Sequence, residues 1–135
     1  MISNTPATIE DATFAESLDI NIADYQRTET GLFWRDLKVG DGAEVASGQT
    51  VSVHYDGYLP DGTLFESSRA SEPITFPVGT GLVIDGWDQG LLGMRAGGER
   101  RLIIPPTLGY GAAGRAPAIP PNATMVFTVT MVAVQ

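Results

Sequence analysis

Apolar and polar residues alternate along much of the chain after residue 30, as they do in half-buried β-strands. In the stretch TVSVHYDGYL (50–59), Val51, Val53 and Tyr55 share one face. The Pro-Asp-Gly turn that follows predicts a hairpin from 50–59 to 63–68, because proline presets φ and glycine accepts a positive φ. Further strands are predicted from GLFWRDLKV, PITFP, ERRLIIP and ATMVFTVTMVAV, the last with one face formed by Met125, Phe127, Val129 and Met131.

One segment of this region has helical periodicity instead. Apolar residues recur there at spacings of three, four and three, at Ile84, Trp87, Leu91 and Met94. Asp85 can cap this helix, with Asp88 completing a weak capping box. The three glycines in the segment each cost a helix about 1 kcal/mol relative to alanine, so its stability must come from packing against a sheet. The pattern therefore predicts an α+β fold, with a mainly antiparallel sheet around one short helix.

The first thirty residues differ from the rest in charge and glycine content. They hold six acidic residues and one arginine, a balance of −5, whereas the whole chain has a net charge of −8. All sixteen glycines lie after residue 30. This shift predicts an acidic extension over residues 1–28 and a folded domain over 29–135. Because acidic runs are usually solvated, we favour a solvated extension over a docked one.

The secondary structure of the extension has two interpretations. Thr8 to Asp11 can start a helix, and near-helical spacing continues through Phe14, Leu18, Ile22 and Tyr25. The stretch LDINI, however, alternates as a strand does. Of the two, we favour a frayed helix.

Composition narrows the classes of function. A chain of 135 residues has room for one domain. Its eight Lys and Arg residues are scattered, which argues against a nucleic-acid partner. Without cysteine, neither disulfides nor thiol chemistry is available. No stretch approaches the roughly 18–20 apolar residues of a membrane span, and no signal sequence is recognisable, so we expect a cytoplasmic protein.

Two apparent chemical motifs do not hold in context. The stretch 109–114, GYGAAG, matches the dinucleotide pattern GxGxxG, but prolines flank it on both sides and no acid follows Glu99 to bind a ribose. His54 is the only histidine, so a histidine-containing metal cluster or a Ser-His-Asp triad has no partners. We therefore expect neither a metal nor another cofactor.

The remaining candidates are apolar. A core interpretation is the default for aromatic residues. Two details favour a binding pocket instead, since Tyr110 lies between glycines in a proline-bounded loop and Glu66 directly follows Phe65. The candidate set comprises Tyr55, Phe65, Phe76, Val83, Ile84, Trp87, Tyr110, Ile119 and Phe127.

Four long motifs follow one another from about residue 31 to residue 134: VSVHYDGYLPDGTLFESS, PITFPVGTGLVIDGWDQGLLGM, GERRLIIPPTLGYGAAG and IPPNATMVFTV. With these motifs the chain resembles the FKBP-type immunophilins, peptidyl-prolyl cis/trans isomerases (rotamases) that bind tacrolimus and rapamycin. The resemblance implies a curved antiparallel β-sheet of about five strands half wrapped around one short α-helix. It also implies a monomeric isomerase and protein-folding chaperone that works without a cofactor. Its partners would be proline-containing peptides, unfolded chains and macrolide inhibitors.

The resemblance also implies a role for each matching position. Trp87 would be the pocket floor, and the catalytic set would be Tyr55, Phe65, Glu66, Trp87, Tyr110 and Phe127. Substrate would be bound by Ile74, Phe76, Val83, Ile84 and Ile119. Within this set, the Ile84 amide and the Tyr110 hydroxyl would hold carbonyl groups of the ligand.

Four positions depart from the family pattern. Glu66 stands where the family usually has aspartate, and Ile74 where some members have a pocket phenylalanine. Arg115 and Ala118 replace a histidine and a longer aliphatic residue of other members. Glu66 in particular permits a rival function, a binding or scaffold module that keeps the pocket but isomerises poorly.

Overall fold

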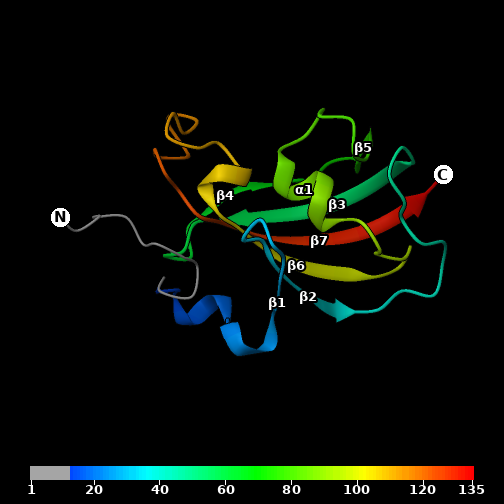
Figure 1. The fold of residues 1–135 in the computed structure, drawn as a ribbon, viewed down its shortest axis with the longest axis horizontal. Coiled ribbons are helices and arrows are strands. Elements are labelled where there is room, and N and C mark those ends of the chain that lie inside the picture. Colours follow the sequence, from blue (N-terminus) through cyan, green and yellow to red (C-terminus); the bar gives the residue numbers. More distant parts are fainter. Residues whose placement is uncertain (1–12) are drawn as a thin grey trace.

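The computed structural model describes residues 13–135, so the predicted helix start at Thr8 to Asp11 lies outside the described residues. An antiparallel sheet forms the centre of the fold (Figure 1). Its long strands are β2 (Phe33–Lys38), β3 (Thr50–Tyr58), β6 (Glu99–Ile104) and β7 (Met125–Val134). Within residues 13–135 the strand order is β1-β2-β6-β7-β3-β4, and β5 also pairs with β3. The predicted antiparallel α+β fold is confirmed.

Three short strands complete the edges of the sheet. β1 (Gln26–Arg27) pairs with β2, and the other edge is shared by β4 (Leu64–Ser67) and β5 (Ile74–Pro77). β4 pairs with the end of β3, from Asp56 to Tyr58, whereas β5 pairs with its start, from Thr50 to Val53. The predicted hairpin between β3 and β4 is confirmed. Because β4 and β5 occupy one edge position, the sheet is about five strands wide apart from the two-residue β1.

The helix α1 (Asp85–Gly90) lies across one face of the sheet (Figure 1). Its glycines permit this close approach. A Cβ atom on Gly86 would stand 2.7 Å from side-chain atoms of Ile104, and one on Gly90 would stand 2.7 Å from Leu102. Trp87 on the same helix is only 4% exposed. Replacing these glycines with alanine, a better helix former, would therefore push the helix off β6.

The predicted capping of α1 is wrong. Ile84 is the N-cap residue and makes no side-chain cap hydrogen bond. The Asp88 carboxylate instead accepts from the backbone N–H groups of Gly79 and Gly81, at 2.8 and 3.0 Å. The loop ahead of the helix folds back over it. Asp88 therefore binds the amides of this loop and does not form the capping box that its spacing from Asp85 predicted.

The C-terminal end of α1 is held by a buried arginine. Arg100 on β6 is 4% exposed, and its Nη1 donates to the carbonyl oxygens of Gly90 and Leu92, both at 2.9 Å. The same guanidinium pairs with the Asp36 carboxylate on β2, at 2.7 and 3.2 Å, and lies 4.2 Å from the centre of the Trp34 ring. One side chain thus joins the helix to two strands.

Residues 13–25 pack on the opposite face of the sheet. They form two 3-10 turns, η2 (Glu16–Leu18) and η3 (Ile22–Asp24), so the expectation of one frayed helix is wrong for this part of the chain. Leu18 is 4% exposed and forms a second apolar cluster with Phe33, Ile103 and Val126. The acidic side chains of this segment are exposed, as expected, but the apolar residues between them dock on the sheet.

We expect Arg100→Met to lower the free energy of unfolding by about 3 kcal/mol, because it leaves Asp36 unpaired beside two unsatisfied helix carbonyls. Chemical denaturation measures the change. Arg95→Met is the matched control, since Arg95 is exposed and, among the described residues, its side chain donates only to the Gly42 carbonyl oxygen, at 3.1 Å. Equal stabilities for the two variants would contradict this account of the helix.

We expect Leu18→Ala to lower the free energy of unfolding by about 2–3 kcal/mol, since it removes a buried side chain from the second apolar cluster. Leu92→Ala, at a position 41% exposed, should change it by no more than about 0.5 kcal/mol. Urea unfolding curves measure both values, provided that the m-value is the same for the parent and the variants. A Leu18→Ala protein as stable as the parent would mean that residues 13–27 contribute nothing to the fold.

Candidate functional site

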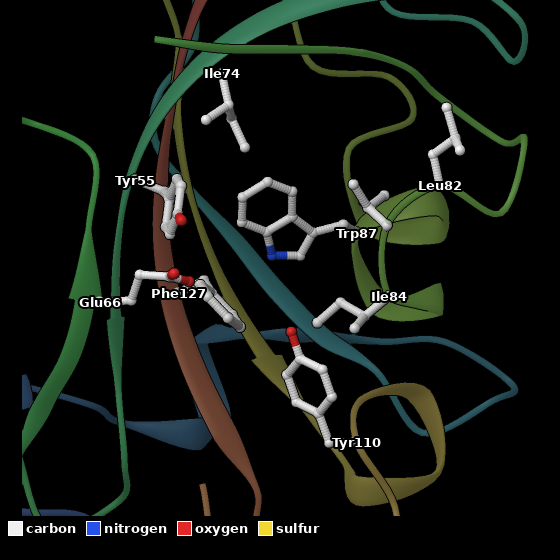
Figure 2. Close-up of a pocket in the computed structure, with 9 residues that line it drawn as sticks. Tyr55, Glu66, Ile74, Leu82, Ile84, Trp87, Tyr110 and Phe127 are labelled. Carbon is white, nitrogen blue, oxygen red and sulfur yellow. The ribbon is translucent and has the colours of Figure 1, made fainter. Parts of the chain in front are cut away.

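A pocket with a volume of about 370 Å³ opens between α1, the sheet and two loops (Figure 2). This size suits a small ligand or a few residues of a peptide. Its lining consists of Tyr55, Glu66, Ile74, Leu82, Val83, Ile84, Trp87, Tyr110 and Phe127. Except for Leu82, each of these belongs to the set expected from the sequence.

Aromatic rings form the base of the pocket. The Trp87 ring contacts Tyr55 on β3 and Phe127 on β7 edge to face, with ring centroids 4.9 and 5.4 Å apart. Each of the three side chains is less than 10% exposed. Such contacts contribute about 0.5–1.5 kcal/mol each beyond the burial of apolar area. The base is therefore apolar and closely packed.

The indole nitrogen of Trp87 is buried and has no conventional hydrogen-bond partner within residues 13–135. Figure 2 draws this nitrogen on the edge of the indole nearest Phe127. The two rings meet at an interplanar angle of 85°, so the N–H can point toward the face of the Phe127 ring.

Tyr55 and Glu66 place polar atoms on one wall. Burial raises the pKa of the Tyr55 hydroxyl far above its usual range, and a hydrogen bond to the Glu66 carboxylate raises it further. Glu66 thus reaches Tyr55 despite the extra methylene that separates it from the family's usual aspartate. An ordinary tyrosine is already neutral at physiological pH, and the shift extends the neutral range of Tyr55 to higher pH.

The opposite wall offers hydrogen-bond donors. The Tyr110 hydroxyl points into the pocket in Figure 2. The Ile84 N–H has no acceptor among the hydrogen bonds of the described residues. Because both groups border the same apolar space, a bound molecule with two carbonyl oxygens could accept from them.

The loop before α1 supplies the residue that the sequence interpretation missed. Leu82 lines the pocket but is 70% exposed, so it forms an apolar rim. Asp88 fixes this loop through its bonds to the Gly79 and Gly81 amides. The adjacency of Leu82 to Val83 was a signal in the sequence, but nothing there showed that Asp88 would anchor the loop.

Three expected site residues lie behind the lining. The Phe65 ring on β4 packs edge to face on Phe127, with centroids 5.6 Å apart, and the Phe76 ring lies 5.7 Å from Trp87. Ile119 is 3% exposed and belongs to the main apolar core. These side chains support the pocket from behind and do not border its empty space.

Residues 13–135 contain no group of three or more His, Asp or Glu side chains able to hold a metal ion. His54 lies on β3, where its Nδ1 is 3.0 Å from the Ser68 hydroxyl, and it does not line the pocket. In the same range, no helix is long and apolar enough to cross a membrane.

Comparison with known proteins gives consistent matches. The model of the family described as FKBP-type peptidyl-prolyl cis-trans isomerase matches residues 42–132. An FK506-binding protein 2 from Yarrowia lipolytica is 56% identical over 88 residues, which cover 64% of this chain and 61% of that protein. An FK506-binding protein from Neisseria meningitidis serogroup B is 47% identical over 105 residues, which cover 77% of this chain and 96% of that protein. The chain thus spans about three fifths of the first relative and nearly all of the second.

Solved structures agree with this match. FkpA from Escherichia coli is 38% identical with a TM-score of 0.77, covering 89% of this chain and 55% of that one. A peptidyl-prolyl cis-trans isomerase from Pseudomonas syringae pv. tomato is 33% identical with a TM-score of 0.75, covering 83% of this chain and 81% of that one. From the aromatic pocket, the order of the strands and these matches, we conclude that the chain belongs to the FKBP-type peptidyl-prolyl cis-trans isomerase family.

Proposed function

We propose that this chain accelerates the cis/trans isomerisation of Xaa-Pro bonds in peptides and unfolded proteins. The observation that carries the proposal is the dry aromatic pocket, which has Trp87 at its base and hydrogen-bond donors on one wall. Membership in a family of isomerases supports the same activity. A proline ring with its preceding carbonyl matches a pocket that combines apolar walls with a few directed polar groups.

The proposed mechanism lowers the barrier without any covalent step. Rotation about a peptide bond must overcome about 18–20 kcal/mol of resonance stabilisation, and the uncatalysed Xaa-Pro reaction takes tens of seconds or more. The twisted transition state has less charge separation than the planar amide. The planar amide is well solvated by water, so a pocket that excludes water favours the twisted form. Trp87, Tyr55 and Phe127 supply that environment, with Phe65 and Phe76 supporting them from behind.

Hydrogen bonds then orient the substrate. The Ile84 N–H and the Tyr110 hydroxyl would each donate to a carbonyl oxygen beside the proline, which holds the bond in a reactive conformation. Shortening the reaction from seconds to milliseconds requires about 4 kcal/mol, at 1.36 kcal/mol per tenfold. Packing and orientation can together supply that amount.

The same pocket is proposed to bind macrolides of the tacrolimus and rapamycin type. The matched relatives carry the name FK506-binding protein, and this chain keeps the apolar base and the two donors. Val83 and Ile74 line its sides, and the exposed Leu82 extends the apolar surface at its rim. A ligand larger than the pocket would therefore contact Leu82 as well.

We expect the chain to accelerate the cis-to-trans reaction of a short Leu-Pro peptide, and rapamycin to abolish the acceleration. Trp87→Leu should lower kcat/KM by about tenfold or more, because it removes the apolar base of the pocket. A protease-coupled or NMR exchange assay measures the rate, and Arg95→Met is the control that should match the parent. No acceleration by a folded parent chain would overturn the proposal.

Glu66→Asp separates catalysis from the rival function as a binding module. If the parent binds rapamycin tightly but isomerises poorly, and Glu66→Asp restores turnover at unchanged affinity, the chain is a binding module. If turnover changes little, the contact between Glu66 and Tyr55 already serves catalysis in this chain.

We expect kcat/KM to be flat from about pH 6.5 to pH 9, since no step of the mechanism transfers a proton and the raised pKa keeps Tyr55 neutral. The sign for stability follows from the same shift. Tyr55 keeps its proton more tightly in the folded state, so its stabilising contribution is complete below the unfolded pKa of about 10 and is lost above it. Rates from pH 6.5 to pH 9 measure the first effect, and unfolding curves extended above pH 10 measure the second. A single ionisation controlling turnover near neutrality would contradict the mechanism.

A further inference from the structure

Arg115 lies beside Tyr110 at the mouth of the pocket. Its Nη1 donates to the Tyr110 hydroxyl oxygen at 3.3 Å, and its Cζ lies 5.6 Å from the centre of the Tyr110 ring. The guanidinium therefore contacts both the ring and the hydroxyl of a residue that lines the pocket. Arg115 itself is exposed and does not line the empty space.

The backbone of Arg115 is held by hydrogen bonds to Ile119. Its N–H donates to the Ile119 carbonyl oxygen at 2.8 Å, and the Ile119 N–H donates back to the Arg115 carbonyl oxygen at 2.9 Å. Ile119 is anchored in the core, and the Gly114 N–H bonds to the Tyr110 carbonyl oxygen at 3.1 Å. This closed turn holds the Arg115 backbone beside Tyr110, so their side-chain contact does not depend on a free loop.

The chemistry of the two groups gives the contact a direction. A guanidinium has only donors, whereas a tyrosine hydroxyl has one donor and two acceptor lone pairs. Arg115 must therefore occupy an acceptor site on the hydroxyl oxygen, which leaves the proton to point elsewhere. No acceptor for that proton is present among the hydrogen bonds of the described residues.

We propose that Arg115 is a positioning residue, which turns the Tyr110 O–H into the pocket and strengthens it as a donor to the carbonyl oxygen of a bound proline peptide. The inference rests on the proposed function. A hydrogen bond from a cation polarises the hydroxyl and makes its proton a better donor. The position that departs from the family pattern thus acts on the reaction through its neighbour.

The charge of Arg115 reaches the other wall as well. Burial and Glu66 raise the pKa of Tyr55, and a smaller effect of Arg115 lowers it. Tyr55 therefore lies within electrostatic reach of the positive charge of Arg115 and of the negative charge of Glu66. Carbonyl oxygens carry partial negative charge, so this field favours their approach on the Tyr110 side.

A double-mutant cycle tests the inference. We expect Arg115→Met to lower kcat/KM on a Leu-Pro peptide by about three- to tenfold, the range of one hydrogen bond. In a Tyr110→Phe background the same change should have less than about a twofold effect, because the group through which Arg115 acts is gone. Arg115→Lys keeps the charge and one point-like donor, so it should restore part of the rate. Tacrolimus affinity, measured by Trp87 fluorescence, should follow the same cycle.

The outcomes separate this inference from the proposed function. Arg95→Met removes an exposed arginine outside the pocket and should match the parent in rate and affinity. If the parent isomerises, and Arg115→Met lowers the rate by the same factor with and without Tyr110→Phe, the positioning role of Arg115 is overturned and the proposed function stands. A parent that neither isomerises nor binds tacrolimus would overturn both proposals. If the parent binds tacrolimus but does not isomerise, the double-mutant cycle measured on tacrolimus affinity tests the role of Arg115. Independent effects of the two substitutions on affinity would overturn that role.

Discussion

The structure depends on holding a six-residue helix against a sheet. α1 is too short to be stable alone and contains glycine at two of its positions. Close contact of these glycines with β6 and the grip of Arg100 on the helix carbonyls keep it in place. Because Trp87 projects from this helix, the base of the pocket is only as well defined as these contacts.

The pocket combines apolar walls with few polar groups, and each polar group has a defined relation to its neighbours. Tyr55 is tied to Glu66 on one wall, and Tyr110 is tied to Arg115 on the other. The buried Trp87 N–H has no hydrogen-bond partner within residues 13–135, and its ring packs edge to face on Phe127. This arrangement suits a reaction in which the amide must lose solvation and keep its orientation, with no bond to the protein.

The sheet is covered on both faces beneath the pocket. Phe127 points toward α1, whereas its neighbour Val126 points toward Leu18 on the other face. Arg101 adds a hydrogen bond at 2.8 Å to the Leu18 carbonyl oxygen. The backbone N–H of Ala15 also bonds to the Pro60 carbonyl oxygen, at 2.7 Å, at the turn that leads into β4. The segment before the predicted boundary at residue 28 therefore contacts the hairpin that carries Glu66, while the boundary itself stays a prediction.

The sequence by itself determined the main strands and the helix, because periodicity of two or of three to four residues is a local property. Most of the pocket lining was expected from the family resemblance of the motifs and not from periodicity. Tertiary structure decided what periodicity cannot encode. It assigned Asp88 to the loop that precedes the helix in place of the helix cap, put Leu82 on the rim, and moved Ile119 into the core. It also docked Leu18 within an acidic segment, since exposed carboxylates and buried apolar side chains can alternate in one stretch. These outcomes depend on which surfaces meet, and that is set by the packing of elements far apart in the chain.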